Sequence, residues 1–183
     1  DGDTSTNDAC VLIATGQSQL DEITEADSPA ARLLYEELTR VFEDLAQALV
    51  RDAEGATKFV EVRVEEAADA ADARAVAETI AHSPLVKTAL FASDPNWGRI
   101  LMAVGRAPAK TLEVNRVRIW LDDVQLVEHG GVHPDYREAD GAAVMARPEI
   151  GIRVALGAGE AAARVWTCDF SYDYVRINAE YRS

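Results

Sequence analysis

The sequence contains few cysteines and few histidines. Two cysteines, Cys10 and Cys168, occur in 183 residues, too few for the disulfide framework of a small secreted protein. Isolated cysteines in apolar or β-type segments are usually small buried hydrophobic residues, and we expect that of both. The three histidines, His82, His129 and His133, form no pair one turn apart on a helix. We therefore expect no zinc site and no other bound metal.

Long apolar runs and basic residues are also scarce. No segment has the regions of a signal peptide or approaches the length of a membrane span. Lys and Arg number 18 against 32 Asp and Glu, giving a net charge of −14 at pH 7. Nucleic acid and anionic membranes would repel this charge, so neither is expected as a partner. We predict a cytoplasmic protein, and small amino-acid or ammonium-bearing ligands suit its charge.

The sequence begins in a polar, acidic loop without a methionine. Residues 1–8 lead into the apolar residues 10–15, which predict a short buried strand. Because a natural domain rarely opens on such a loop, we expect an upstream part of the fold to be missing. Asp1 and Asp3 have the spacing of a Mg²⁺-dependent phosphatase, but no strand precedes them and no later acidic pair falls in a loop suited to a second metal. A turn closed by its own Asx, Ser and Thr side chains is the favoured interpretation.

Apolar periodicity and turn signals predict a mixture of helices and strands. Ser28-Pro29 begins a helix of about six turns, and Asp122-Asp123 joins two strands in a hairpin. The segment 93–99 is expected to cap a further helix, with Pro95 in its first turn. Helices are predicted near residues 29–49, 69–81, 85–91, 100–104 and 138–146, and strands near 58–64, 116–121, 124–128, 150–156 and 161–172, with 174–177 extending the last. The fold class is α+β, or loosely mixed α/β, arranged in layers.

Two segments combine polar and aromatic residues in unusual ways. In the segment 54–59, Glu54, Gly55 and Lys58 precede a strand, which fits either a ligand site or a helix-ending glycine with a solvated Glu–Lys pair. The segment 169–183 is rich in tyrosine, and such a chain end is expected to be docked rather than frayed. No phosphate loop, dinucleotide fingerprint or nucleophile-elbow motif is present. Composition and spacing alone therefore indicate a soluble α+β domain.

The motifs identify a family resemblance across essentially the whole chain. Residues 1–8, 54–59, 94–100 and 166–183 occur in this order in the ornithine acetyltransferases, bifunctional glutamate N-acetyltransferases of arginine biosynthesis. The sequence resembles most of their β chain. The resemblance implies a sheet-and-helix sandwich, with residues 1–65 in the main catalytic sandwich, 66–160 in a smaller subdomain, and 161–183 as a β-rich tail that docks toward the active site.

The resemblance also implies an activity and its partners. The expected reaction moves the acetyl group from N2-acetylornithine to glutamate through an acyl-enzyme, in a ping-pong scheme. The family precursor cuts itself, and the β chain works with the α chain, here expected as an α₂β₂ heterotetramer. No cofactor is expected; many members also use acetyl-CoA as acetyl donor, and no single residue decides this here.

Site residues follow from matching motif positions. Glu54, Asn178 and Ser183 match substrate-binding positions, while the nucleophilic Thr is expected upstream, so Thr57 and the other internal threonines are not assigned this role. Glu66 stands where the family pattern has a glycine after a strand, a difference expected to affect only a turn. The alternative to an acetyltransferase is a non-catalytic amino-acid-binding module; the phosphatase ranks far behind both.

Overall fold

The computed structural model describes residues 2–181. The chain divides into two compact units, Asp1–Ala46 and Gln47–Ser183. The division falls inside the first helix, so most of that helix belongs to the first unit.

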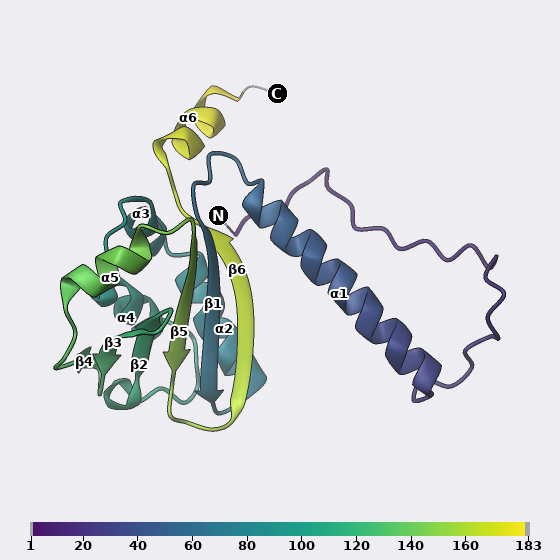
Figure 1. The fold of residues 1–183 in the computed structure, drawn as a ribbon, viewed down its shortest axis with the longest axis horizontal. Helices are drawn as coiled ribbons and strands as arrows, with labels where there is room; N and C mark the ends of the chain where they lie inside the picture. Colours follow the sequence, from purple (N-terminus) through teal and green to yellow (C-terminus); the bar gives the residue numbers. More distant parts are fainter. Residues whose placement is uncertain (1, 182–183) are drawn as a thin grey trace. The chain divides into compact units, whose positions relative to one another are not determined.

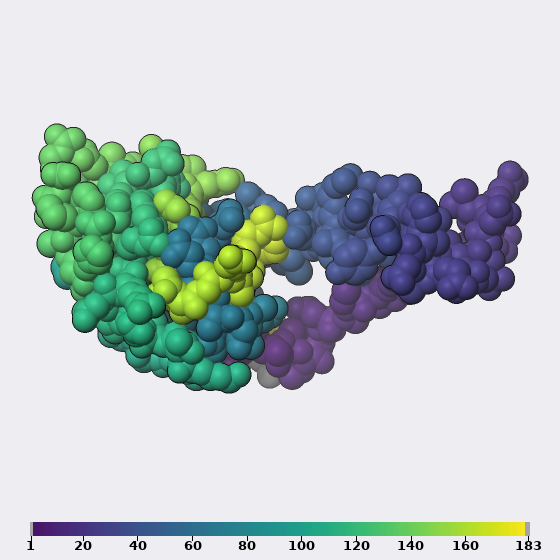
Figure 2. Space-filling view, turned by 90° about the horizontal axis from the view of Figure 1, so that it is seen from below, coloured from purple at the N-terminus to yellow at the C-terminus, as the bar shows by residue number. Residues whose placement is uncertain are grey.

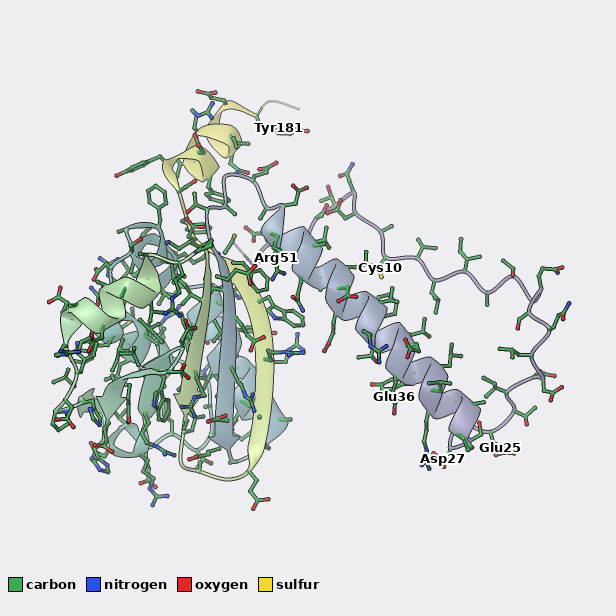
Figure 3. All side chains as sticks on the ribbon, in the orientation of Figure 1. Cys10, Glu25, Asp27, Glu36, Arg51 and Tyr181 are labelled. Atoms are coloured by element: carbon green, nitrogen blue, oxygen red, sulfur yellow. The ribbon has the colours of Figure 1, made fainter. Side chains whose placement is uncertain are left out.

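The first unit contains an extended segment followed by helix α1 (Pro29–Arg51). Ser28 Oγ accepts a hydrogen bond from the Ala31 amide at 3.2 Å, which confirms the predicted helix start. The strand predicted over residues 10–15 is wrong: these residues form no regular structure and are exposed, Cys10 included (Figure 3). A strand needs a hydrogen-bonded neighbour, and none of the described strands pairs with this segment.

The second unit contains one mixed sheet of six strands in the order β4-β3-β2-β5-β1-β6 (Figure 1). β1 runs parallel to β5 and antiparallel to β6, and β2 runs antiparallel to β3 and β5. Val62 lies beside Ile152 in the register, so the alternating apolar residues of both strands share one buried face. The strands are β1 (Phe59–Ala67), β2 (Arg118–Leu121), β3 (Val124–Glu128), β4 (Gly131–Val132), β5 (Glu149–Ala155) and β6 (Ala161–Cys168).

Helices cover the buried face of this sheet, and their apolar residues join the strands in a single core. α2 contacts β1 and β6 and also α4, as Figure 1 shows behind the sheet. The helices are α2 (Ala70–Ala81), α3 (Pro84–Phe91), α4 (Trp97–Gly105), α5 (Glu138–Met145) and α6 (Tyr172–Glu180), with a short 3₁₀ turn at Val114–Arg116. The mixed α/β class predicted from the sequence is confirmed. Among the described residues, no helix is both long and apolar enough to cross a membrane.

Local sequence signals correctly predicted the positions of most helices and turns. Asp69 and Ser83 cap α2 and α3 with their side chains, and Asp122 has the positive φ, 47°, of a tight hairpin turn. The cap of α4 is Asn96, whose Oδ1 accepts the Arg99 amide at 3.1 Å, so the cap lies within the predicted segment 93–99. Pro95 precedes the helix and does not stand in its first turn as predicted.

Glu66 occupies a bulge near the end of β1. Its φ is +55°, and the pairing of β1 with β6 shifts register between Val64 and Ala67. The Glu66 carbonyl accepts the amides of Ala158 and Gly159 at 2.8 and 3.1 Å. A glycine reaches this left-handed conformation more easily than a glutamate, which fits the glycine that the resemblance leads us to expect here. The position lies in a bulge inside β1, not in a turn after the strand as predicted.

The predicted β-rich tail is wrong in its second half. β6 ends at Cys168, and residues 172–180 form helix α6 instead of a strand at 174–177. Ser171 Oγ accepts the Tyr174 amide at 3.2 Å as the helix cap, and Asp173 pairs with Arg176 three residues later. These local interactions outweigh the strand preference of the tyrosines. The boundary predicted at residues 65 and 66 falls inside β1, which lies between β5 and β6.

Candidate substrate-binding site

Two predicted site residues, Glu54 and Asn178, meet where helix α6, drawn above the sheet in Figure 1, contacts the loop before β1. Asn178 Nδ2, on α6, donates to Glu54 Oε2 at 3.2 Å and to the Tyr174 carbonyl at 2.9 Å. Both side chains are exposed. Because the Asn178 amide hydrogens have these two acceptors, its Oδ1 is the atom that would accept a hydrogen bond from a ligand. A carboxylate and an amide oxygen side by side suit an ammonium or N–H group. Ser183 lies outside the described residues.

The loop that carries Glu54 connects α1 to β1. Lys58 does not pair with Glu54: its Nζ donates to the carbonyls of Met145 and Arg147 at 2.7 and 3.3 Å. The solvated Glu–Lys pair considered for this segment is therefore absent. The Thr57 hydroxyl donates to Asp169 Oδ2 at 2.6 Å, so it is held by a carboxylate. Glu54 is left facing Asn178.

Sequence reasoning missed three residues beneath this site: Asp169, Ser171 and Lys87. All three are buried, with 1%, 5% and 1% of their surface exposed. Figure 2 shows yellow residues of the C-terminal part of the chain beside blue residues from its first half, as the pairing of β6 with β1 requires. The only sequence signal was Ser171, a cap residue three positions before Tyr174, and it favours a helix at 172–180.

Lys87 is a buried ammonium group at the end of β6. Its Nζ donates to Thr167 Oγ1 at 2.8 Å and to the Cys168 carbonyl, and it lies 4.6 Å from the centre of the Phe170 ring. Burial lowers the pKa of Lys87 from its ordinary value, and the neighbouring Cys168 and Asp169 oppose this effect. Cys168 is partly buried, so the expectation of a buried cysteine holds better for it than for Cys10.

The signature 94–100 lies at a different place. Residues 94–98 line a cavity of about 320 Å³ together with Tyr136 and Glu138. The Tyr136 hydroxyl is buried and has no hydrogen-bond partner among the described residues. Its pKa is raised by burial, and the carboxylates of Glu138 and Asp94 add to the effect.

Fold and site together define a class: a mixed α/β protein with an exposed carboxylate and an exposed amide side by side where α6 meets the loop before β1. Comparison with known proteins gives the family. The chain belongs to the ArgJ family, which matches residues 1–183.

Two relatives agree with this family. The chain is 60% identical to the arginine biosynthesis bifunctional protein ArgJ of Methylococcus capsulatus over all 183 residues and spans 45% of that protein's length. It is also similar to the crystal structure of the arginine biosynthesis bifunctional protein ArgJ of Bacillus halodurans, with a TM-score of 0.92 and 37% identity. That match covers 99% of this chain and 84% of the crystallised one.

Proposed function

We propose that this chain is part of an acetyltransferase that moves the acetyl group of N2-acetylornithine to glutamate in arginine biosynthesis. Membership of the ArgJ family supports the proposal. The structural observation that carries it is the Glu54–Asn178 hydrogen bond, which joins two positions 124 residues apart that the resemblance assigns to substrate binding.

The proposed reaction has two acyl transfers. A threonine hydroxyl outside this chain attacks the acetyl carbonyl of N2-acetylornithine, the C–N bond breaks, and the ornithine amine leaves with the proton that the hydroxyl loses. The glutamate amine then attacks the acetyl-threonine ester, the C–O bond breaks, and the threonine hydroxyl is restored. Acetyl-CoA is an alternative first donor, with its thiol as the leaving group.

This chain contributes substrate positioning to the scheme. The Glu54 carboxylate would attract the cationic end or the amine of ornithine, and Asn178 would bond the amino-acid portion. Ser183 belongs to the same proposed set. The nucleophile and the groups that stabilise the tetrahedral oxyanion would come from an α chain of the same precursor in an α₂β₂ assembly.

The test uses the complete gene product. Intact-mass measurement and N-terminal sequencing should find two co-purifying chains. The chain that contains the present sequence should begin with threonine. Acetyl transfer from N2-acetylornithine to glutamate is then measured for wild type and Glu54→Gln. We expect the variant to lose about tenfold or more in kcat/KM for N2-acetylornithine, since a hydrogen bond to a charged group contributes roughly 1.5–3 kcal/mol.

Glu160→Gln is the matched control. Glu160 is exposed, and it precedes Ala161, which pairs with Ala67 at the other end of β1 from Glu54. The same loss of charge there should leave kcat/KM unchanged. If the product is instead a single uncut chain that binds N2-acetylornithine or glutamate in calorimetry without turnover, the amino-acid-binding module is favoured over the acetyltransferase. Equal kinetics for both variants would remove Glu54 from the site.

A further inference from the structure

A buried carboxylate fixes the loop that carries Glu54. Asp169 Oδ1 accepts the amides of Thr57 and Lys58, each at 2.8 Å, and Oδ2 accepts the Thr57 hydroxyl at 2.6 Å. All three donors belong to the segment between Glu54 and β1. Because Asp169 is 1% exposed, water cannot replace these bonds without opening the structure.

Ser171 joins the same loop to helix α6. Its hydroxyl donates to the Gly55 carbonyl at 2.5 Å and accepts the Tyr174 amide at 3.2 Å. One hydroxyl therefore bonds both the residue after Glu54 and the first turn of the helix that carries Asn178. The two backbones also touch, since a Cβ on Gly55 would lie 2.5 Å from the Tyr174 nitrogen.

Phe170, which lies between Asp169 and Ser171, is held by helix α3. The Phe170 amide donates to the Lys87 carbonyl at 3.1 Å, and Lys87 Nζ bonds the end of β6. Phe170 also stacks on Tyr174 with ring centres 4.4 Å apart. Residues 169–171, which we call the clamp, are thus tied to α3 behind them and to the Glu54 loop in front.

Glu54 and Asn178 have less support of their own. Both are exposed, the bond between them is 3.2 Å long, and the other bond of Asn178 goes to the Tyr174 carbonyl of its own helix. An exposed pair of this kind contributes little to its own orientation, because water competes for both groups. The relative position of the two side chains depends instead on the backbones beneath them, which the clamp joins.

We propose that Asp169 and Ser171 are positioning residues, which hold the Glu54 carboxylate and the Asn178 amide at the separation that the amino-acid substrate requires. The inference rests on the proposed function. A misplacement of about 1 Å can cost roughly a hundredfold in rate. Loss of the clamp should therefore lower catalysis although neither residue touches substrate.

The chain offers a matched control at the other end of the sheet. Asp72, at the start of α2, is buried and holds a distant loop in the same way, accepting the Lys110 amide at 3.1 Å and the Thr111 amide at 3.3 Å. Alanine at this position removes the same kind of bond without disturbing the Glu54 loop.

The experiment compares Asp169→Ala and Ser171→Ala with Asp72→Ala in the complete gene product. All three should lower the melting temperature. Only the clamp variants should lower kcat/KM for N2-acetylornithine, by roughly tenfold or more. Asp169→Asn keeps one oxygen for the two amides and the shape of the side chain, so it should recover much of the loss and also serves if Asp169→Ala does not fold.

Two further readouts separate the clamp from mere stability and from the proposed function. In a Glu54→Gln background, Asp169→Ala should cost much less than in wild type, because the group that it positions is already impaired. Additive losses, or equal kinetic losses in clamp and control variants, would overturn the proposal. Wild type without acetyl transfer would contradict the proposed function alone.

In that case the clamp is tested by ligand binding and hydrogen exchange. Asp169→Ala should lose exchange protection at the Thr57 and Lys58 amides and weaken ornithine binding measured by calorimetry. Glu54→Gln should weaken binding but keep the protection. Unchanged protection or unchanged ornithine affinity in Asp169→Ala would contradict the clamp.

Discussion

Lys87 is the largest side chain that is fully buried among the described residues, and its charge makes stability depend on pH. Burial lowers its pKa in the folded state below the ordinary value of 10.5. Between the folded and unfolded pKa values, the unfolded chain binds a proton that the folded chain does not. The free energy of unfolding should therefore rise as pH increases through this window, and level off above about 10.5.

Lys87→Met should abolish this rise. The variant also leaves Thr167 and the Cys168 carbonyl without their donor, so we expect it to be less stable by roughly 1–3 kcal/mol near neutral pH. The stability gap should widen at alkaline pH. Urea unfolding over a pH series measures this, in a Cys168→Ser background because the thiol lies 3.8 Å from Nζ. Parallel curves for the two proteins would show that Lys87 does not titrate in this window.

At the scale of single residues, the sequence located Glu54 and Asn178 but not their support. Both came from matching family motifs, and the structure brings them within hydrogen-bond distance. Asp169 gave no signal, because an aspartate between a strand and a capping serine looks like an ordinary loop residue. Its function as an acceptor depends on a contact with Thr57, 112 residues away, which no local pattern encodes.

The contact between the Glu54 loop and α6 depends on a glycine. Gly55 has a φ of +69°, and an added Cβ would meet the Tyr174 backbone at 2.5 Å. Gly55→Ala should therefore destabilise the protein by the cost of a left-handed alanine, about 1 kcal/mol, plus the cost of separating the two backbones. It should also lower kcat/KM for N2-acetylornithine, because the separation moves Glu54 away from Asn178.

Gly157→Ala separates the two effects. Gly157 has nearly the same φ, +66°, but its added Cβ would lie 3.1 Å from Arg116 Cβ, a contact that a shift of a few tenths of an ångström relieves. Thermal unfolding and acetyl-transfer kinetics of both variants give the comparison. We expect the larger fall in melting temperature, and the only fall in kcat/KM, for Gly55→Ala. Equal effects would show that α6 does not press on this loop.

Elements with local end signals were predicted well, and those that depend on distant partners were not. α2 and α3 begin where Asp69 and Ser83 cap them, and the hairpin turns at Asp122. Residues 10–15 have the composition of a strand but no described partner. The tail has strand-favouring tyrosines, yet Ser171 and the Asp173–Arg176 pair make it helical. In both segments, the available hydrogen-bond partners determined the structure more than the strand preference of the residues did.

For the whole molecule, charge and apolar surface are unevenly distributed. The first fifty residues hold eleven acidic and two basic residues, and the remainder hold 21 and 16. Apolar side chains on the same N-terminal part are exposed, most clearly along helix α1. A helix with acidic residues and an exposed apolar face is typical of a surface that another chain covers, and the proposed α chain would cover this one.

The exposed face of α1 should make residues 1–183 associate when they are produced alone. Leu34, Val41, Leu45 and Leu49 recur at helical spacing and are 50%, 52%, 56% and 76% exposed. At physiological salt, where repulsion between the acidic chains is screened, the average mass from light scattering should rise above 19.8 kDa with concentration. Leu45→Glu should reduce this association, because it places a charge in the centre of the apolar face.

Gln47→Glu adds the same charge two residues away, on the polar side of α1, and should leave the association unchanged. Production together with the upstream part of the precursor should abolish the concentration dependence, because the proposed α chain then covers the face and gives a fixed assembly. If the chain alone stays at 19.8 kDa at every concentration, the apolar face of α1 does not bind another chain. If Gln47→Glu disrupts association as much as Leu45→Glu does, net charge rather than apolar contact controls it.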